Sequence, residues 1–249
     1  MNKIKQIIKQ IILLIKTMKF LISSILVRNK LERKLKYTED KAMPHPEMLK
    51  TRSDWAVNSL NTLGLEPEIV FNEDFRLEDN MVLICNHRSF LDILIIESLM
   101  KKLHKKQSTF VAKKELKSSF VLGRLYTLFG ALFIDRDNPR DFIKLLRQIK
   151  KIIKEFPKGN VFVIYPEGTR NKNKDINSIE VFKEGFLKIA NQTKVNILPV
   201  FIEGGVESYF ENVGGDKRKI KVRVGAIIET ENKSVKDIEN IYKQSFNLK

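Results

Sequence analysis

The sequence predicts an α/β protein in which helices cover a mixed, largely parallel sheet, with a helical extension before it. From residue 69 onward, short apolar runs alternate with helical stretches, which is typical of this class. The run at 82–85 is continuously apolar, as in a strand buried on both faces. Residues 3 to about 36 carry a long helical pattern. We therefore expect a helical extension at 1–66 and one α/β domain at 67–249.

The first expected helix, residues 3 to about 36, is basic and amphipathic. Lys9, Lys16 and Lys19 interrupt its apolar run before it reaches the ~18 residues that indicate a membrane span. Each lysine at the bilayer centre would cost about 2.5 to 3.5 kcal/mol. A helix lying in the membrane interface is therefore favoured. One face, at spacings of four and three, carries Ile4, Ile8, Ile11, Ile15, Met18, Ile22 and Ile25.

Three other interpretations of this helix stay open. A tilted or re-entrant insertion would use the same apolar face. A coiled-coil or core-packing helix has the same spacing. A secretory signal fits less well, because Ser23-Ser24 is a poor cleavage site and basic residues follow closely.

The remaining elements follow in order along the chain. Pro44-His45-Pro46 interrupts the chain, and a second helix is expected from Glu47 to Leu63, before Gly64. Strands are expected at 69–71, 82–85, 109–112, 132–134, 161–165, 197–201 and 219–228. Helices are expected at 91–103, 119–128, 139–155, 179–191 and 235–245.

The charge and the cysteine content limit the classes of partner and site. A formal net charge of +16 predicts attraction to a polyanion: nucleic acid, an anionic membrane surface or a phosphorylated small molecule. Cys85 is the only cysteine, which excludes an intrachain disulfide and a multi-cysteine metal site. A reducing compartment is therefore favoured.

A histidine and an aspartate follow the strand expected at 82–85. His87 lies just beyond the strand, and Ser89 and Asp92 indicate a helix start, with Ser89 as N-cap. Open α/β sheets bind ligands at the carboxyl ends of their strands. A neutral imidazole there could remove a proton from a hydroxyl, and the carboxylate would fix its tautomer. Alternatively, Asp92 only caps the helix and His87 is a turn residue.

Two further expected strands end in arginines, Arg136 and Arg170. Guanidinium groups are planar, permanently charged and suited to phosphate oxygens. Gly168 would allow the backbone to approach a ligand closely. The alternative is that each arginine is solvated or paired with a neighbouring carboxylate, such as Asp135 or Glu167.

Four ordered blocks resemble the glycerolipid acyltransferase family, in particular its 1-acyl-sn-glycerol-3-phosphate acyltransferases. The blocks are Asn86-His87-Arg88-Ser89-Phe90-Leu91-Asp92, Gly130 to Arg136, Tyr165-Pro166-Glu167-Gly168-Thr169-Arg170 and Val195 to Val200. Tyr165 stands where phenylalanine is more usual. A basic segment around Lys113, between the first two blocks, is also similar to the family.

The resemblance implies transfer of an acyl chain to the sn-2 hydroxyl of 1-acyl-sn-glycerol 3-phosphate (lysophosphatidic acid). The donor would be acyl-coenzyme A or acyl-carrier protein, with no bound cofactor and no metal. A thioester is already activated, so general-base assistance suffices; Cys85 is more simply a buried hydrophobe than an acyl carrier. By resemblance, His87 is the base and Asp92 is its partner. Arg136, Arg170 and Lys113 hold the phosphate. Glu167 and Gly168 shape the pocket, and Thr169 donates a hydrogen bond.

The implied partners are lysophosphatidic acid, the acyl thioester donor and an anionic membrane surface, with an acyl-carrier protein as a candidate. The implied location is the cytoplasmic face of a membrane. No nucleic-acid partner is expected, because the basic residues follow no known binding signature. The alternatives are a related lysolipid or glycerol-3-phosphate acyltransferase and a non-catalytic basic membrane-binding protein.

Overall fold

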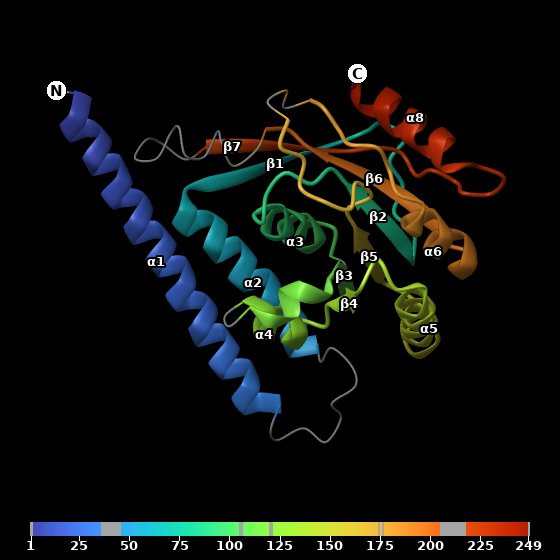
Figure 1. The fold of residues 1–249 in the computed structure, drawn as a ribbon, viewed down its shortest axis with the longest axis horizontal. Helices are drawn as coiled ribbons and strands as arrows, with labels where there is room; N and C mark the ends of the chain where they lie inside the picture. The colour runs from blue at the N-terminus through green and yellow to red at the C-terminus, as the bar shows by residue number, and fades with distance from the viewer. Residues whose placement is uncertain are drawn as a thin grey trace.

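The computed structural model describes residues 2–35, 46–104, 107–119, 122–173, 175, 177–204 and 218–248. A seven-stranded sheet forms its middle layer, with helices on both faces (Figure 1). His45 lies outside the described residues.

The sheet is mixed and mostly parallel, as predicted. Its order is β1 (Leu65–Phe71), β7 (Arg218–Val224), β6 (Asn196–Ile202), β2 (Met81–Cys85), β5 (Asn160–Ile164), β3 (Gln107–Lys113) and β4 (Leu132–Ile134). Neighbouring strands are parallel except β6 and β7. Strands β6, β2, β5, β3 and β4 therefore run in one direction, and their carboxyl ends share one edge.

Two hydrophobic cores lie on opposite faces of the sheet. Successive residues of a strand point to opposite faces, so Leu83 and Cys85 of β2 enter one core and Val82 and Ile84 enter the other. The first core is covered by α2 (Pro46–Leu63), α3 (Asp92–Lys102) and α4 (Leu122–Leu128); the 3₁₀ helix η1 (Lys114–Ser118) precedes α4 and has no buried residue. The second is covered by α5 (Pro139–Glu155), α6 (Gly185–Thr193) and α8 (Val235–Phe246).

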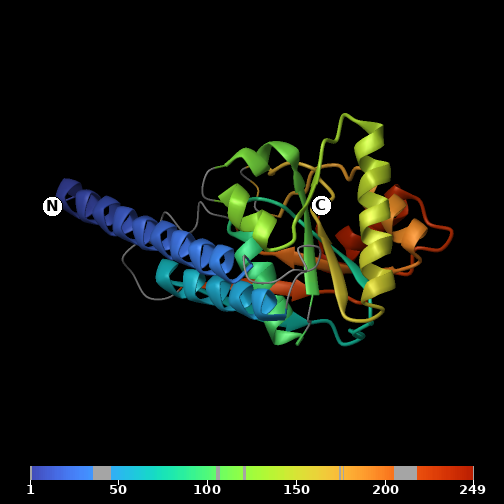
Figure 2. The same ribbon diagram turned by 90° about the horizontal axis from the view of Figure 1, so that it is seen from below.

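The long helix α1 (Asn2–Leu35) packs along α2 on the outside of the first core (Figure 2). Phe20, Ser24 and Leu31 are buried there, and Trp55 of α2 donates from Nε1 to Ser24 Oγ at 3.2 Å. On the other side of α1, Ile4, Ile8, Ile11, Ile15, Met18 and Ile22 are 48–66% exposed. By length and composition alone, Ile4–Arg33 is sufficient to cross a membrane.

Four expected elements differ from the observed ones by more than two residues. The strand expected at 69–71 begins at Leu65, and the helix expected at 119–128 begins, as α4, at Leu122, with η1 lying before the expected range. The strand expected at 219–228 ends at Val224, and Ile228 makes only an isolated bridge with Ile197. The helix expected from 179 begins at Gly185, because side chains and the 165–170 loop hold the backbone N–H groups before it, as described below.

Candidate active site

The sheet topology brings the residues predicted from separate parts of the sequence to one edge. His87 follows the carboxyl end of β2, and the 165–170 segment follows that of β5. Lys113 is the last residue of β3, and Arg136 follows β4. These four strands are neighbours in the sheet and run parallel. The predicted convergence of strand ends is therefore confirmed.

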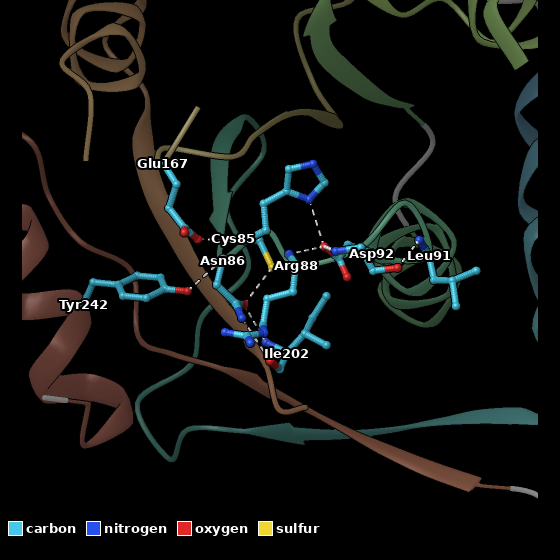
Figure 3. Close-up of polar contacts among 10 residues, drawn as sticks. Cys85, Asn86, Arg88, Leu91, Asp92, Glu167, Ile202 and Tyr242 are labelled. Atoms are coloured by element: carbon cyan, nitrogen blue, oxygen red, sulfur yellow. Dashed lines mark hydrogen bonds and ion pairs between the residues drawn. The ribbon is translucent and has the colours of Figure 1, made fainter. Parts of the chain in front are cut away.

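Asp92 orients His87 and organises the turn around it (Figure 3). His87 Nδ1 lies 2.8 Å from Asp92 Oδ2, and the same oxygen accepts the backbone N–H groups of Arg88 and Ser89, each at 2.8 Å. The predicted helix start is wrong in detail: Ser89 is not the N-cap, because α3 begins at Asp92 with Leu91 before it. Ser89 Oγ instead accepts the N–H of Leu91. Asp92 therefore orients His87 and holds the turn before α3, whereas α3 has no side-chain cap hydrogen bond, so the capping interpretation of Asp92 is wrong.

Tyr165 forms one wall of the histidine site. Its ring stacks on the imidazole of His87, with ring centroids 4.0 Å apart and planes inclined by 18°. Burial raises the pKa of the Tyr165 hydroxyl well above its ordinary value, so this group stays neutral. The aromatic residue at the start of the third block was the only sequence signal for this contact.

Glu167 binds backbone at the site and is almost fully buried. Its Oε1 accepts the N–H of His87 at 2.8 Å, and its Oε2 accepts the N–H of Glu180 at 3.1 Å. Burial raises the pKa of Glu167 to about 7, against the lowering effect of these two hydrogen bonds. The carboxylate therefore connects the turn after β2 to the segment before α6.

Residues that the sequence did not single out hold the turn in place. The Asn86 amide exchanges two hydrogen bonds with the backbone of Ile202, at 2.8 and 3.0 Å (Figure 3). Tyr242 of α8 accepts the N–H of Asn86 at 3.1 Å and donates to Val200 O at 2.7 Å. Tyr242, more than 150 positions away, had no sequence signal.

The polar loop at 171–178 is tied to the same turn. Arg88, which is buried, donates to the carbonyl oxygens of Asn173 and Asp175. The N–H of Asn171 donates to His87 O at 2.7 Å. Asn171, Asn173 and Asp175 are therefore held against the His87 turn.

A cavity of about 680 Å³ lies beside this turn, between the sheet edge, α5 and α6. Five predicted residues line it: Lys113, Arg136, Glu167, Gly168 and Thr169. Its deeper wall is apolar and includes Ile134, Phe142, Leu145, Phe186 and Ile189. Tyr165 and Glu167, which contact His87, belong to the wall, whereas His87 and Asp92 do not. The cavity is therefore separated from the imidazole by one layer of side chains.

Arg170 is exposed and does not line the cavity. Among the described residues, neither Arg136 nor Arg170 forms an ion pair; Asp135 instead lies 3.9 Å from Lys114. Partial burial lowers the pKa of the Arg136 guanidinium, and the charges of Glu115 and Asp137 oppose this shift. Arg136 is therefore a cation at the cavity without a bonded carboxylate.

A model of the Acyltransferase family matches residues 66–203, which is more than half of the chain. The chain belongs to this family. This match confirms the family that the sequence predicted by resemblance, and membership in the family accounts for the four ordered blocks.

Individual relatives in this family carry a common name. A 1-acyl-sn-glycerol-3-phosphate acyltransferase of Cocos nucifera is 35% identical over 123 residues, covering 49% of this chain and 37% of that protein. A probable 1-acyl-sn-glycerol-3-phosphate acyltransferase of Mycoplasma genitalium is 34% identical over 139 residues, covering 55% of this chain and 49% of that protein. The matched region thus spans less than half the length of these two relatives.

The fold is similar to that of a solved acyltransferase. The crystal structure of the 1-acyl-sn-glycerophosphate (LPA) acyltransferase PlsC from Thermotoga maritima superposes with a TM-score of 0.69 at 20% identity. The superposition covers 99% of this chain and 97% of that chain. At this identity the likeness concerns the fold alone.

Proposed function

We propose that the protein transfers an acyl group from a thioester donor to the sn-2 hydroxyl of lysophosphatidic acid and so forms phosphatidic acid. The observation that carries the proposal is the His87–Asp92 pair beside a cavity lined by Lys113 and Arg136. The His87–Asp92 pair suits activation of a hydroxyl, and the two cations, Lys113 and Arg136, suit binding of a phosphate. The names of the family relatives support the same acceptor.

In this proposal His87 is the general base. Its Nδ1–H donates to Asp92, which leaves the lone pair of Nε2 for the substrate. Nε2 takes the proton of the sn-2 hydroxyl while that oxygen forms a bond to the thioester carbonyl carbon. The carbon–sulfur bond then breaks, and the thiolate takes the proton back from Nε2. The imidazole ends neutral, as it began.

Lys113 and Arg136 would bind the phosphate from the cavity wall, with Thr169 donating a further hydrogen bond. Gly168 has a φ of +74°, and a Cβ there would lie 3.3 Å from Arg136 Nη1, so a side chain would crowd the guanidinium. Arg170 would contribute from outside the cavity. Glu167 would act through the backbone of His87, since a carboxylate against the phosphate would repel it.

The proposed location is the cytoplasmic face of a membrane, with residues 1–66 as the anchoring extension and 67–249 as the catalytic domain. An interfacial position for α1 is supported by its two faces: one is exposed and apolar, while Phe20 and Leu31 on the other pack into the protein. Phe20 also lies 6.4 Å, between ring centroids, from Phe90 in the first block. The anchoring helix would therefore bring lipid close to the His87 turn.

The experiment is a product analysis with the full chain on liposomes, with acyl-coenzyme A and acyl-carrier protein tested separately as donors. The acceptors are lysophosphatidic acid, glycerol 3-phosphate and a lysolipid whose phosphate is a diester. We expect phosphatidic acid from the first acceptor, detected by mass spectrometry. Acylation of only glycerol 3-phosphate or only the diester lysolipid would identify a related acyltransferase instead. Absence of any acylated product would favour the non-catalytic membrane-binding alternative.

A further inference from the structure

A third cation, Lys183, lines the same cavity as Lys113 and Arg136. It lies in the segment between the polar loop and α6, which none of the four sequence blocks includes. Lys188, one turn into α6, lines the same cavity. The two lysines differ in their partners, and this difference gives them different roles.

The backbone around Lys183 is held from three directions. The N–H of Glu180 donates to Glu167, and the N–H of Phe182 donates to Glu239 Oε2 at 3.1 Å. The N–H of Lys183 itself donates to Pro166 O at 2.8 Å. The Phe182 ring is buried and packs edge-on against Tyr242. Lys183 therefore projects from a backbone whose position is set by the site loop.

Lys183 and Arg136 meet at the same backbone position. A Cβ placed on Gly168 would lie 3.3 Å from Arg136 Nη1 and 3.5 Å from Lys183 Cγ. The absence of a side chain at Gly168 thus leaves room for both side chains against the loop. This geometry brings a second cationic side chain beside the guanidinium that is proposed to bind phosphate.

The ammonium group of Lys183 has no ion-pair partner in the described part of the chain, whereas that of Lys188 does. Lys188 Nζ lies 2.6 Å from Glu184 Oε2, four residues earlier. The nearby carboxylates of the cavity wall are Asp137 and Glu167, and Glu167 binds backbone N–H groups. Lys183 is therefore available for a ligand anion.

We propose that Lys183 is a third phosphate-binding cation of the acceptor site, acting with Lys113 and Arg136 on the phosphate monoester. This inference rests on the proposed function for its acceptor. A phosphate monoester carries about 1.5 to 2 negative charges near pH 7, so a third cation adds attraction that a diester would use less. Lys183 would thus help to select phosphate monoesters over lysolipids with substituted phosphates.

The test compares Lys183→Gln with Lys188→Gln, a matched control that removes a charge from the same cavity wall. Losing one hydrogen bond to a charged group costs enough to raise the Michaelis constant for lysophosphatidic acid about tenfold or more. The kcat and the Michaelis constant for the acyl donor should change little. Lys183→Arg should retain most of the affinity, and Lys188→Gln should resemble the wild type.

Calorimetric titration of glycerol 3-phosphate into the full chain tests the same inference without turnover. Weaker binding of glycerol 3-phosphate to Lys183→Gln than to Lys188→Gln would support the role of Lys183. This holds even if the wild type does not acylate lysophosphatidic acid; in that case only the proposed function fails. Equal effects of the two variants on binding and on the acceptor's Michaelis constant would overturn the role of Lys183. So would an effect confined to the acyl donor, or no binding of glycerol 3-phosphate to the wild type.

Discussion

At the residue scale, one oxygen atom of Asp92 organises the candidate site. It accepts three hydrogen bonds, from the His87 ring and from the N–H groups of Arg88 and Ser89. The sequence predicted the pairing of His87 with Asp92 because both belong to one short block. It did not predict that the carboxylate holds the turn before α3, because the path of the backbone through Arg88 and Ser89 cannot be derived from spacing alone.

Glu167 should make stability depend on pH. Its pKa is raised from an ordinary value of 4.5 to about 7 in the folded protein. The folded state therefore binds a proton at Glu167 more tightly than the unfolded state does. Below pH 4.5 this proton binding makes its full contribution to the unfolding free energy. The contribution falls as the pH rises towards about 7, by up to about 3 kcal/mol, and is level above that pH.

The variant Glu167→Gln removes this titration. We expect the melting temperature of the wild type, relative to the variant, to be higher at pH 5 than at pH 8. Thermal denaturation followed by circular dichroism at both pH values measures the difference. A wild-type advantage that is the same at pH 5 and pH 8 would show that Glu167 does not titrate with a raised pKa.

At the scale of the elements, continuous apolar runs made the strands predictable. The conformation of the segment before α6 was not predictable. Residues 179–184 have a helical pattern, but distant groups use their N–H donors: Glu167 binds Glu180, and Glu239 binds Phe182. Glu167 lies in the loop after β5, and Glu239 lies in α8. No local pattern reports them, and Lys183 was missed for the same reason.

Helix α2 is fixed to the catalytic part of the protein by a buried ion pair. Arg52 Nε lies 3.0 Å from Glu97 Oε2 of α3, and Arg52 Nη1 also donates to Ser108 O of β3 at 2.8 Å. Glu97 is fully buried, so removing the cation would leave its charge without compensation. The pair therefore links the N-terminal helices to the helix that begins with Asp92.

We expect Arg52→Met to lower the unfolding free energy by about 3 to 5 kcal/mol. The exposed arginine Arg76, which lies 3.0 Å from Glu229, is the matched control, and Arg76→Met should cost less than about 1 kcal/mol. Denaturant unfolding in detergent micelles, followed by the fluorescence of the single tryptophan, Trp55, measures both. Equal losses for the two variants would contradict a stabilising role for the buried pair.

The exposed face of α1 should decide membrane binding. Ile8→Lys with Ile15→Lys places two charges in this face and should shift the protein from liposomes to the soluble fraction in a flotation assay. Gln10→Lys with Thr17→Lys adds the same charge at exposed polar positions and should leave binding to anionic liposomes intact. Similar release by both pairs would argue against an interfacial apolar face.

At the scale of the whole molecule, the sequence predicted the class of the fold and the convergence of strand ends. The order of the strands was beyond it, because pairing such as β1 with β7 joins residues that are more than 150 positions apart. The sequence predicted one apolar face of α1, the stripe from Ile4 to Ile25, and did not divide the apolar residues of the helix between the protein and its surroundings. In the structure they divide, because Phe20 and Leu31 pack into the protein and the isoleucine stripe remains exposed.

The whole arrangement places a helix with an exposed apolar face, the His87–Asp92 pair and a cationic cavity in one unit. The first core face carries α1 and α3, whereas α5 covers the other face (Figure 2). The cavity is lined by residues of the sheet edge, α5 and α6. The His87 turn lies where these parts meet. The proposed acyl transfer depends above all on His87 acting as the base.

Thiol release from an acyl thioester in the presence of lysophosphatidic acid tests this claim most directly. The account predicts that His87→Ala lowers kcat by about 10² to 10⁴, with Asp92→Asn in the same range because it removes the partner that fixes the tautomer. Unaltered Trp55 fluorescence would establish that the variants are folded. A folded His87→Ala protein that releases thiol at the wild-type rate would contradict the account.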